Sequence, residues 1–152
     1  MEWMLLPFKR YADFTGRSRR KEYWMFVLFN IIVATVLAIV VFGLLGGGAA
    51  FEDADPDNPF SIYGALFAGA GLLFVLYWLV VLIPSIAVGV RRLHDRNMSG
   101  WWYLGFIVLS MIPLVGFIAS IAMLVIMALP GTDGPNKYGP DPKGGADVAA
   151  FT

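Results

Sequence analysis

Charged residues lie only between or beyond three long apolar stretches, at residues 23–45, 61–90 and 101–129. A helix needs about 20 apolar residues to cross a hydrocarbon core of roughly 30 Å, and each stretch is that long. None shows the period-2 alternation of strands, and in lipid a helix satisfies its backbone polar groups within one segment. The pattern therefore predicts an all-α membrane protein with three transmembrane segments.

The third stretch allows two interpretations. Its 29 residues would measure about 43 Å as one straight helix, and Pro113 near the middle removes a backbone donor and kinks or breaks a helix. We favour a single kinked span that leaves the C-terminus outside, because a hairpin tip at membrane depth must be shielded by protein. The alternative is a helical hairpin with legs of about 12–14 residues, which returns the C-terminus to the cytoplasm.

A short amphipathic helix is expected ahead of the first span. Pro7 suits a first helical turn, and Phe8, Tyr11 and Ala12 recur at the spacing of one helix face. Such a helix lies in the membrane interface.

The domain organisation follows from the same pattern. Glycine and proline after the third stretch predict consecutive turns close to the membrane. We therefore expect a single integral-membrane domain at residues 1–142 and a flexible C-terminal tail at 143–152.

The distribution of lysine and arginine predicts the orientation. The N-terminal arm has six basic residues and the loop at 91–100 has three, whereas the loop at 46–60 has none and carries four acidic residues. Since basic flanks stay in the cytoplasm, the N-terminus and the loop at 91–100 are expected inside. The acidic loop is then expected in the periplasm or outside the cell.

Composition excludes a soluble or disordered protein. Hydrophobic residues make up 59% of the chain and charged residues 14%, against roughly 45–50% and 25% in soluble domains. The absence of cysteine excludes disulfides and thiolate chemistry. The 11 basic and 11 acidic residues cancel, which argues against a nucleic-acid partner. The two segments expected in the cytoplasm nevertheless sum to +5, from nine basic and four acidic residues.

The loop at 91–100 is the densest polar cluster, and His94, the one histidine, stands beside Asp95. Adjacent side chains on a helix diverge, so these two are poorly placed to form an acid–base pair. No nucleophile accompanies them at a known spacing, and one histidine without cysteine makes a poor metal site. We expect no catalytic residues, no metal and no cofactor, and interpret the cluster as capping the second span.

Six residues form the candidate site for an anionic lipid, a phosphate ligand or a partner protein: Arg17, Arg19, Arg91, Arg92, His94 and Asp95. The leading hypothesis is a non-enzymatic scaffold that binds a membrane-protein partner, or a second copy, through this arginine-rich cytoplasmic face. The alternative is binding of anionic lipid or phosphate. A small channel or transporter is less favoured, because the apolar stretches contain no charged residue.

Three polar motifs resemble those of a bacterial family of small inner-membrane proteins, catalogued as domain of unknown function 805. They are Phe14-Thr15-Gly16-Arg17-Ser18-Arg19 with Glu22-Tyr23-Trp24, Arg91-Arg92-Leu93-His94-Asp95 with Ser99-Gly100-Trp101-Trp102, and Pro130-Gly131-Thr132 with Asn136-Lys137-Tyr138-Gly139-Pro140-Asp141-Pro142. The resemblance covers about residues 5–142. It implies an inner-membrane protein with several helices and no assigned activity. If the C-terminal segment is cytoplasmic, the three motifs share one face and could form one site.

Overall fold

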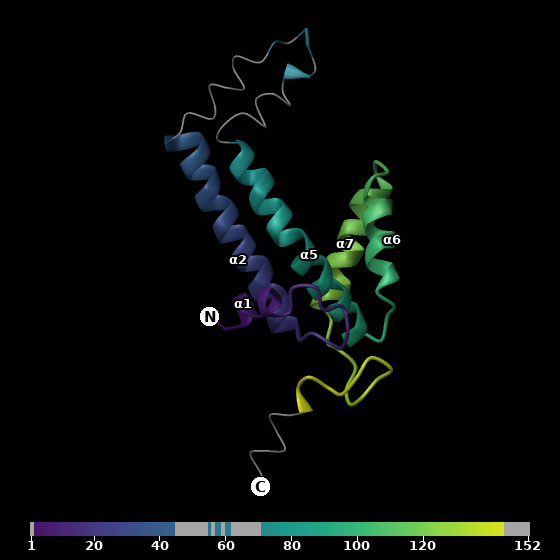
Figure 1. Ribbon diagram of the computed structural model, residues 1–152. Helices are drawn as coiled ribbons and strands as arrows, with labels where there is room; N and C mark the ends of the chain where they lie inside the picture. The colour runs from purple at the N-terminus through teal and green to yellow at the C-terminus, as the bar shows by residue number, and fades with distance from the viewer. Residues whose placement is uncertain (1, 45–54, 56, 59, 62–70, 145–152) are drawn as a thin grey trace. The chain divides into compact units, whose positions relative to one another are not determined.

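The computed structural model describes residues 2–44, 55, 57–58, 60–61 and 71–144 (Figure 1). Within these ranges the chain is helical and has no strand, which confirms the predicted all-α class. The helices are α1 (Glu2–Lys9), α2 (Arg20–Ala38), the π-helical turn η1 (Ile39–Leu44), α5 (Gly71–Asp95), α6 (Trp101–Ser110) and α7 (Val115–Ala128). Most of the predicted acidic loop at 46–60 and the tail from 145 onward lie outside the described residues.

Two helical segments, Arg20–Phe42 and Gly71–Asp95, are long and apolar enough to cross a membrane. Large apolar side chains along them, such as Ile31, Val36 and Trp78, are more than half exposed. A water-soluble protein rarely leaves so much apolar surface uncovered, so these faces are suited to lipid.

The chain divides into two compact units, Met1–Phe26 with Ile83–Thr152, and Val27–Leu82. In the second unit the Tyr77 hydroxyl donates a hydrogen bond of 2.7 Å to Oδ1 of Asn30. This bond pairs the one side-chain amide of the first apolar stretch, where an unpaired amide would be costly. The first unit carries all six candidate site residues.

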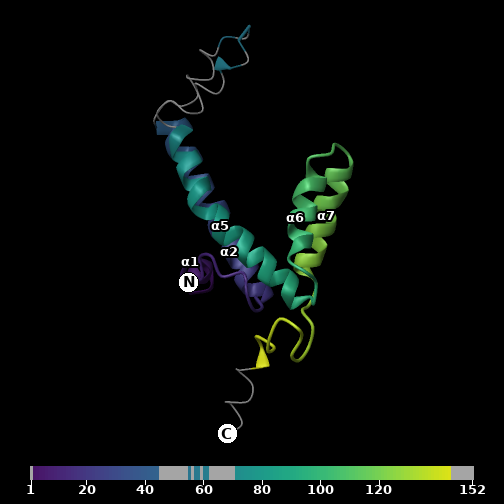
Figure 2. The same ribbon diagram turned by 45° about the vertical axis from the view of Figure 1, so that its right-hand side comes forward.

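The third apolar stretch forms a helical hairpin, so the single kinked span that the sequence favours is wrong. α6 and α7 lie side by side in both views, joined by a tight turn at residues 111–114 (Figures 1 and 2). Leu114 has a positive φ of 67° with ψ of −51°, and the Val115 amide donates to the Pro113 carbonyl at 2.8 Å, so the chain reverses in a γ-turn after Pro113. The two legs have 10 and 14 residues, or about 15 and 21 Å.

The hairpin turn satisfies several of its own backbone groups, which reduces the shielding that its tip needs from other parts of the protein. The amides of Met111 and Ile112 donate to the carbonyls of Val108 and Leu109 at 3.2 and 3.1 Å. The Gly116 amide donates back across the turn to the Ile112 carbonyl at 2.7 Å. Each of these bonds spares a polar group that lipid could not solvate.

Two predicted boundaries also shift. The N-terminal helix spans Glu2–Lys9, so Pro7 lies inside it, and Tyr11 and Ala12 follow it in a turn. An acidic residue in the first turn and a lysine in the last complement the helix dipole, which favours this earlier position. The second predicted span corresponds to α5, which continues through Asp95, so the first five residues of the predicted loop at 91–100 are helical.

Candidate functional site

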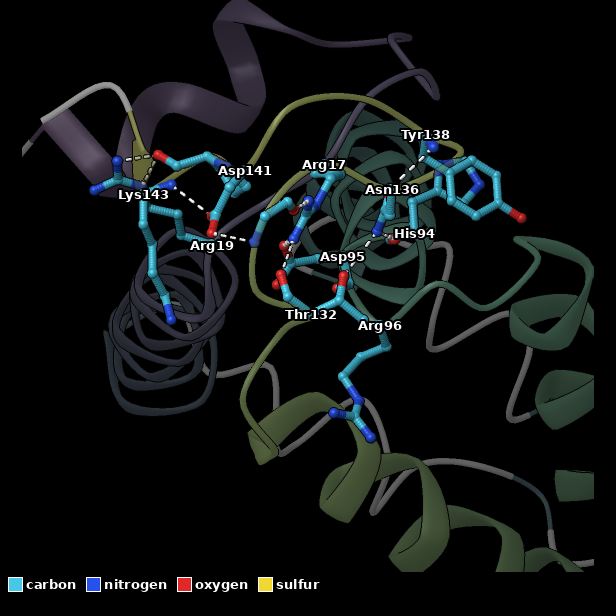
Figure 3. A network of polar contacts seen from close by, with 12 residues as sticks. Arg17, Arg19, His94, Asp95, Arg96, Thr132, Asn136, Tyr138, Asp141 and Lys143 are labelled. Atoms are coloured by element: carbon cyan, nitrogen blue, oxygen red, sulfur yellow. Dashed lines mark hydrogen bonds and ion pairs between the residues drawn. The ribbon is translucent and has the colours of Figure 1, made fainter. Parts of the chain in front are cut away.

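The three polar motifs meet at Asp95, the last residue of α5 (Figure 3). Its Oδ1 accepts a hydrogen bond from Arg17 Nε at 3.0 Å, and its Oδ2 accepts one from Arg92 Nη1. Its backbone carbonyl accepts from the amide and the hydroxyl of Thr132 at 2.9 and 3.1 Å. One residue of α5 is therefore bonded to the N-terminal arm, to α5 itself and to the C-terminal segment.

Arg17 binds the C-terminal segment with the rest of its guanidinium. Nη1 donates to the Gly134 carbonyl at 2.6 Å, and Nη2 donates to the Thr132 carbonyl at 2.5 Å. Its side chain is 1% exposed. Since its bonds span both the carboxylate and these carbonyls, Arg17 fixes the path of residues 132–134.

Arg91 performs the same task for the N-terminal arm. Nη2 pairs with Glu22 Oε1 at 3.0 Å, and Nη1 donates to the Asp13 carbonyl at 2.7 Å. The Ser18 amide donates to the Arg91 carbonyl at 3.1 Å. Both charged side chains of this pair are buried, so the arm is held to α5 by an ion pair shielded from water.

Arg92 caps the C-terminal end of α7. Nε donates to the Met127 carbonyl at 3.1 Å, and Nη2 donates to the Leu129 carbonyl. The last carbonyls of a helix lack partners within it, and a cation there also complements the helix dipole. Arg92 thus joins the end of the hairpin to α5 and Asp95.

The C-terminal segment in turn caps α5. Asn136 Nδ2 donates to the His94 carbonyl at 2.9 Å, next to the Asp95 carbonyl that Thr132 occupies. The helix ends in a Schellman arrangement, with Asn97 at φ of 59° and the Met98 amide bonded to the Leu93 carbonyl at 3.0 Å. The predicted capping at this helix end is present, and it comes both from the loop itself and from the C-terminal segment.

His94 and Asp95 point to different partners, as their adjacency on a helix predicts. The imidazole stacks on the Tyr138 ring at 3.8 Å and 5°, and its Nδ1 lies 3.2 Å from the Gly16 carbonyl oxygen. The carboxylate faces the two arginines instead. This geometry forms no acid–base dyad.

Arg19 occupies the edge of the cluster. Its Nε donates to the Pro142 carbonyl at 2.5 Å, and its guanidinium lies 5.6 Å from the centre of the Trp3 ring. Arg19 is partly exposed, whereas Arg17, Arg91 and Arg92 are buried. Of the four arginines, Arg19 has the most surface left for an incoming group.

Burial makes the cluster energetically demanding. Three guanidiniums share two buried carboxylates, Glu22 and Asp95. Backbone carbonyls accept from most of the other donors, whereas Nε of Arg91 is buried without a partner among the described residues. An uncompensated buried charge costs several kcal/mol, so each ion here depends on its neighbours. The arrangement holds the N-terminal arm, α5, the end of α7 and the C-terminal segment together.

Two carboxyl groups at the rim have perturbed titration. The hydroxyl and amide of Thr15, together with the Arg10 guanidinium, hold the pKa of Asp13 well below its usual range. The amide of Lys143, and more weakly that of Gly134, lower the pKa of Asp141. Both carboxylates close turns next to the cluster. In the described part of the chain, no group of three histidine, aspartate or glutamate side chains could hold a metal ion.

All six predicted site residues lie in this cluster, together with three residues that the sequence pattern did not single out. Glu22, Thr132 and Asn136 supply the counter-ion and the caps described above. The signal was present, since all three stand in the polar motifs. What pattern alone does not reveal is which motif residue faces which.

Fold and site together define a helical membrane protein whose polar motifs are bonded to one another at one helix end. A family model described as "Protein of unknown function (DUF805)" matches residues 11–140, so the chain belongs to that family. It is 40% identical to the inner membrane protein YhaH of Escherichia coli K12, over 94% of this chain and 98% of the relative. It is 36% identical to YhaI, a second inner membrane protein of that strain, over 97% and 100%. No solved structure matches the chain.

Proposed function

We propose that this chain is a non-enzymatic integral protein of the bacterial inner membrane that binds a partner protein through its cytoplasmic face. The N-terminal arm, the end of α5 and the C-terminal segment form that face. The distribution of lysine and arginine along the sequence favours the other side of the membrane for the acidic loop at 46–60. The convergence of the three motifs on Asp95 carries the proposal. It uses polar residues of all three motifs to build a fixed surface.

The charge left exposed on that surface is mainly basic. Lys9, Arg20, Lys21, Lys137 and Lys143 are exposed, against the acids Glu2 and Asp133. Because the buried arginines are already paired, these outer groups are the ones available to a partner. They suit an acidic segment of a membrane protein, since complementary charge steers and orients association.

A photo-crosslinking residue placed at Lys137 tests the proposal in cells. We expect a discrete crosslinked product that weakens several-fold when Lys9 and Lys143 are both changed to Gln. The same crosslinker at Ile31, an exposed apolar position on α2, is the matched control. The mass of the product crosslinked at position 137 distinguishes a second copy of this chain from a different protein. Monomer alone at every position would refute partner binding.

A second candidate is contact with anionic lipid. A cavity of about 330 Å³ is lined by Arg20, Lys21, Trp24, Met25 and Ala128. Two cations beside an indole ring suit a phosphate headgroup at the membrane surface, at about 1 kcal/mol per basic residue. Native mass spectrometry should show phosphatidylglycerol retained by the unmodified chain. The double variant Arg20→Gln with Lys21→Gln should lose this lipid, whereas Lys143→Gln should keep it. Equal retention by all three proteins would eliminate this candidate.

A further inference from the structure

A cavity of about 560 Å³ lies between α5 and α6, beside the arginine cluster. Its volume falls in the range of small-molecule sites. None of its lining residues, in the part of the chain that the structure describes, is a lysine, arginine, aspartate or glutamate. The walls are aliphatic and aromatic, and the polar groups come from the motif residues at one end.

The cavity is an elongated trough. Ile86, Val90 and His94 follow one another on successive turns of α5, which gives the wall a length of about 12 Å. Leu104 and Ile107 of α6 face the same space. Gly89 sets the spacing of the helices, because a Cβ there would lie 2.2 Å from a ring carbon of Tyr103.

His94 presents an acceptor to this trough. Its Nδ1 faces the Gly16 carbonyl, which can only accept, so in the neutral ring Nδ1 carries the proton and Nε2 holds a lone pair. Nε2 lies 3.4 Å from where a Cβ on Gly100 would stand, and Gly100 lines the same cavity. Among the described residues Nε2 has no hydrogen-bond partner, and the stacked Tyr138 ring holds the imidazole in place (Figure 3).

We propose that this trough binds an uncharged amphiphile, whose hydroxyl group donates to Nε2 of His94 and whose hydrocarbon chain lies along Ile86, Val90 and Leu104. A charged headgroup would be desolvated here with no counter-ion, which is costly, whereas a hydroxyl needs only one acceptor. Diacylglycerols and long-chain isoprenoid alcohols share this chemistry. The site is independent of partner binding, since the lining carries none of the exposed basic residues.

Two matched probes test the hydrogen bond: a bromine-bearing dodecyl alcohol and its methyl ether, which keeps the chain but has no donor. Bromine quenches Trp101, the tryptophan that lines the trough, and the Trp101→Phe chain identifies that part of the signal. In the purified full chain the alcohol should bind about fivefold more tightly than the ether. His94→Phe keeps an aromatic ring against Tyr138 but has no acceptor, so it should bind both probes equally. Equal binding of the two probes by the unmodified chain would overturn the assignment.

A pair of glycine variants tests the location. A Cβ on Gly100 would lie 2.7 Å from a methyl carbon of Val90 and beside Nε2, so Gly100→Ala should weaken binding of the alcohol about tenfold or more. Gly105→Ala is the control, because a Cβ there meets nothing within 4 Å. Undiminished binding by Gly100→Ala would place the probe elsewhere. Displacement of the probe by dioleoylglycerol or by farnesol then distinguishes the two lipid sources.

Discussion

At the scale of single residues, Asp95 is the point at which all three motifs are bonded together. Its carboxylate pairs with two buried guanidiniums, and its carbonyl is capped by Thr132. Gly131 packs directly against it, since a Cβ there would stand 2.0 Å from Oδ2. Two residues of the Pro-Gly-Thr motif thus accommodate Asp95: Gly131 leaves room for its carboxylate, and Thr132 donates its amide and its hydroxyl to the Asp95 carbonyl.

Asp95→Asn should destabilise the folded protein by about 3–5 kcal/mol. The substitution leaves Arg17 and Arg92 buried without their shared counter-ion, and breaking a buried pair costs about that much. Reversible unfolding in detergent micelles, followed by circular dichroism, measures the change. Asp133→Asn, at an exposed position of the same segment, should stay within about 0.5 kcal/mol of the parent. A similarly small effect at Asp95 would mean that the ion pairs contribute little.

Asp141 predicts an acid-sensitive turn. Its carboxylate accepts from the amides of Lys143 and Gly134 at 2.9 and 3.1 Å, and its pKa is lowered from the usual 3.8. A depressed pKa means that the stabilisation is present above the usual value and lost as pH falls through the lowered one. Amide exchange at Gly134 and Lys143 should therefore lose protection below about pH 4. Asp141→Asn removes this titration, so protection that falls identically in that variant would assign the effect to another acid.

At the scale of elements, the α6–α7 hairpin depends on one close approach. A Cβ on Gly116 would lie 2.5 Å from the Ser110 carbonyl oxygen, whereas a Cβ on Gly105 would meet nothing. Gly116→Ala should cost about 1–3 kcal/mol through overpacking. Gly105→Ala should instead stabilise by up to about 1 kcal/mol, because alanine favours the helix. The same unfolding measurement compares them, and equal effects would argue against the tight turn.

Sequence predicted the helices well and their connections poorly, for physical reasons. Apolar length alone identifies α2 and α5, because lipid demands it. The hairpin depends on the positive φ of Leu114 and on the contact of Gly116 with Ser110. A hydropathy pattern contains no information about either feature. The sequence identifies the candidate arginines by residue type, but it does not identify their partners. Arg92 binds backbone carbonyls, and since every residue has one, no side chain in the sequence indicates this contact.

At the scale of the whole molecule, the zero net charge is the sum of segments that differ in sign. The N-terminal arm and the loop at 91–100 together sum to +5, whereas the loop at 46–60 carries four acidic residues and no basic one. Within the cluster, the buried charged side chains form ion pairs with one another. The charged side chains that stay exposed around the cluster are mainly basic. Because Thr132 and Asn136 are bonded to the end of α5, the C-terminal segment must share the side of the membrane that residues 94–95 occupy.

That constraint yields a prediction of topology. The chain has no cysteine, so Lys9→Cys, Asp57→Cys and Lys143→Cys each introduce a single thiol at an exposed position. A membrane-impermeant maleimide should label the thiol at position 57 in intact spheroplasts. Positions 9 and 143 should react only after the membrane is permeabilised, because basic flanks stay in the cytoplasm and the C-terminal segment is tied to α5. Labelling at 143 without permeabilisation, with 9 protected, would require a third crossing and would contradict both the hairpin and the contacts at Asp95.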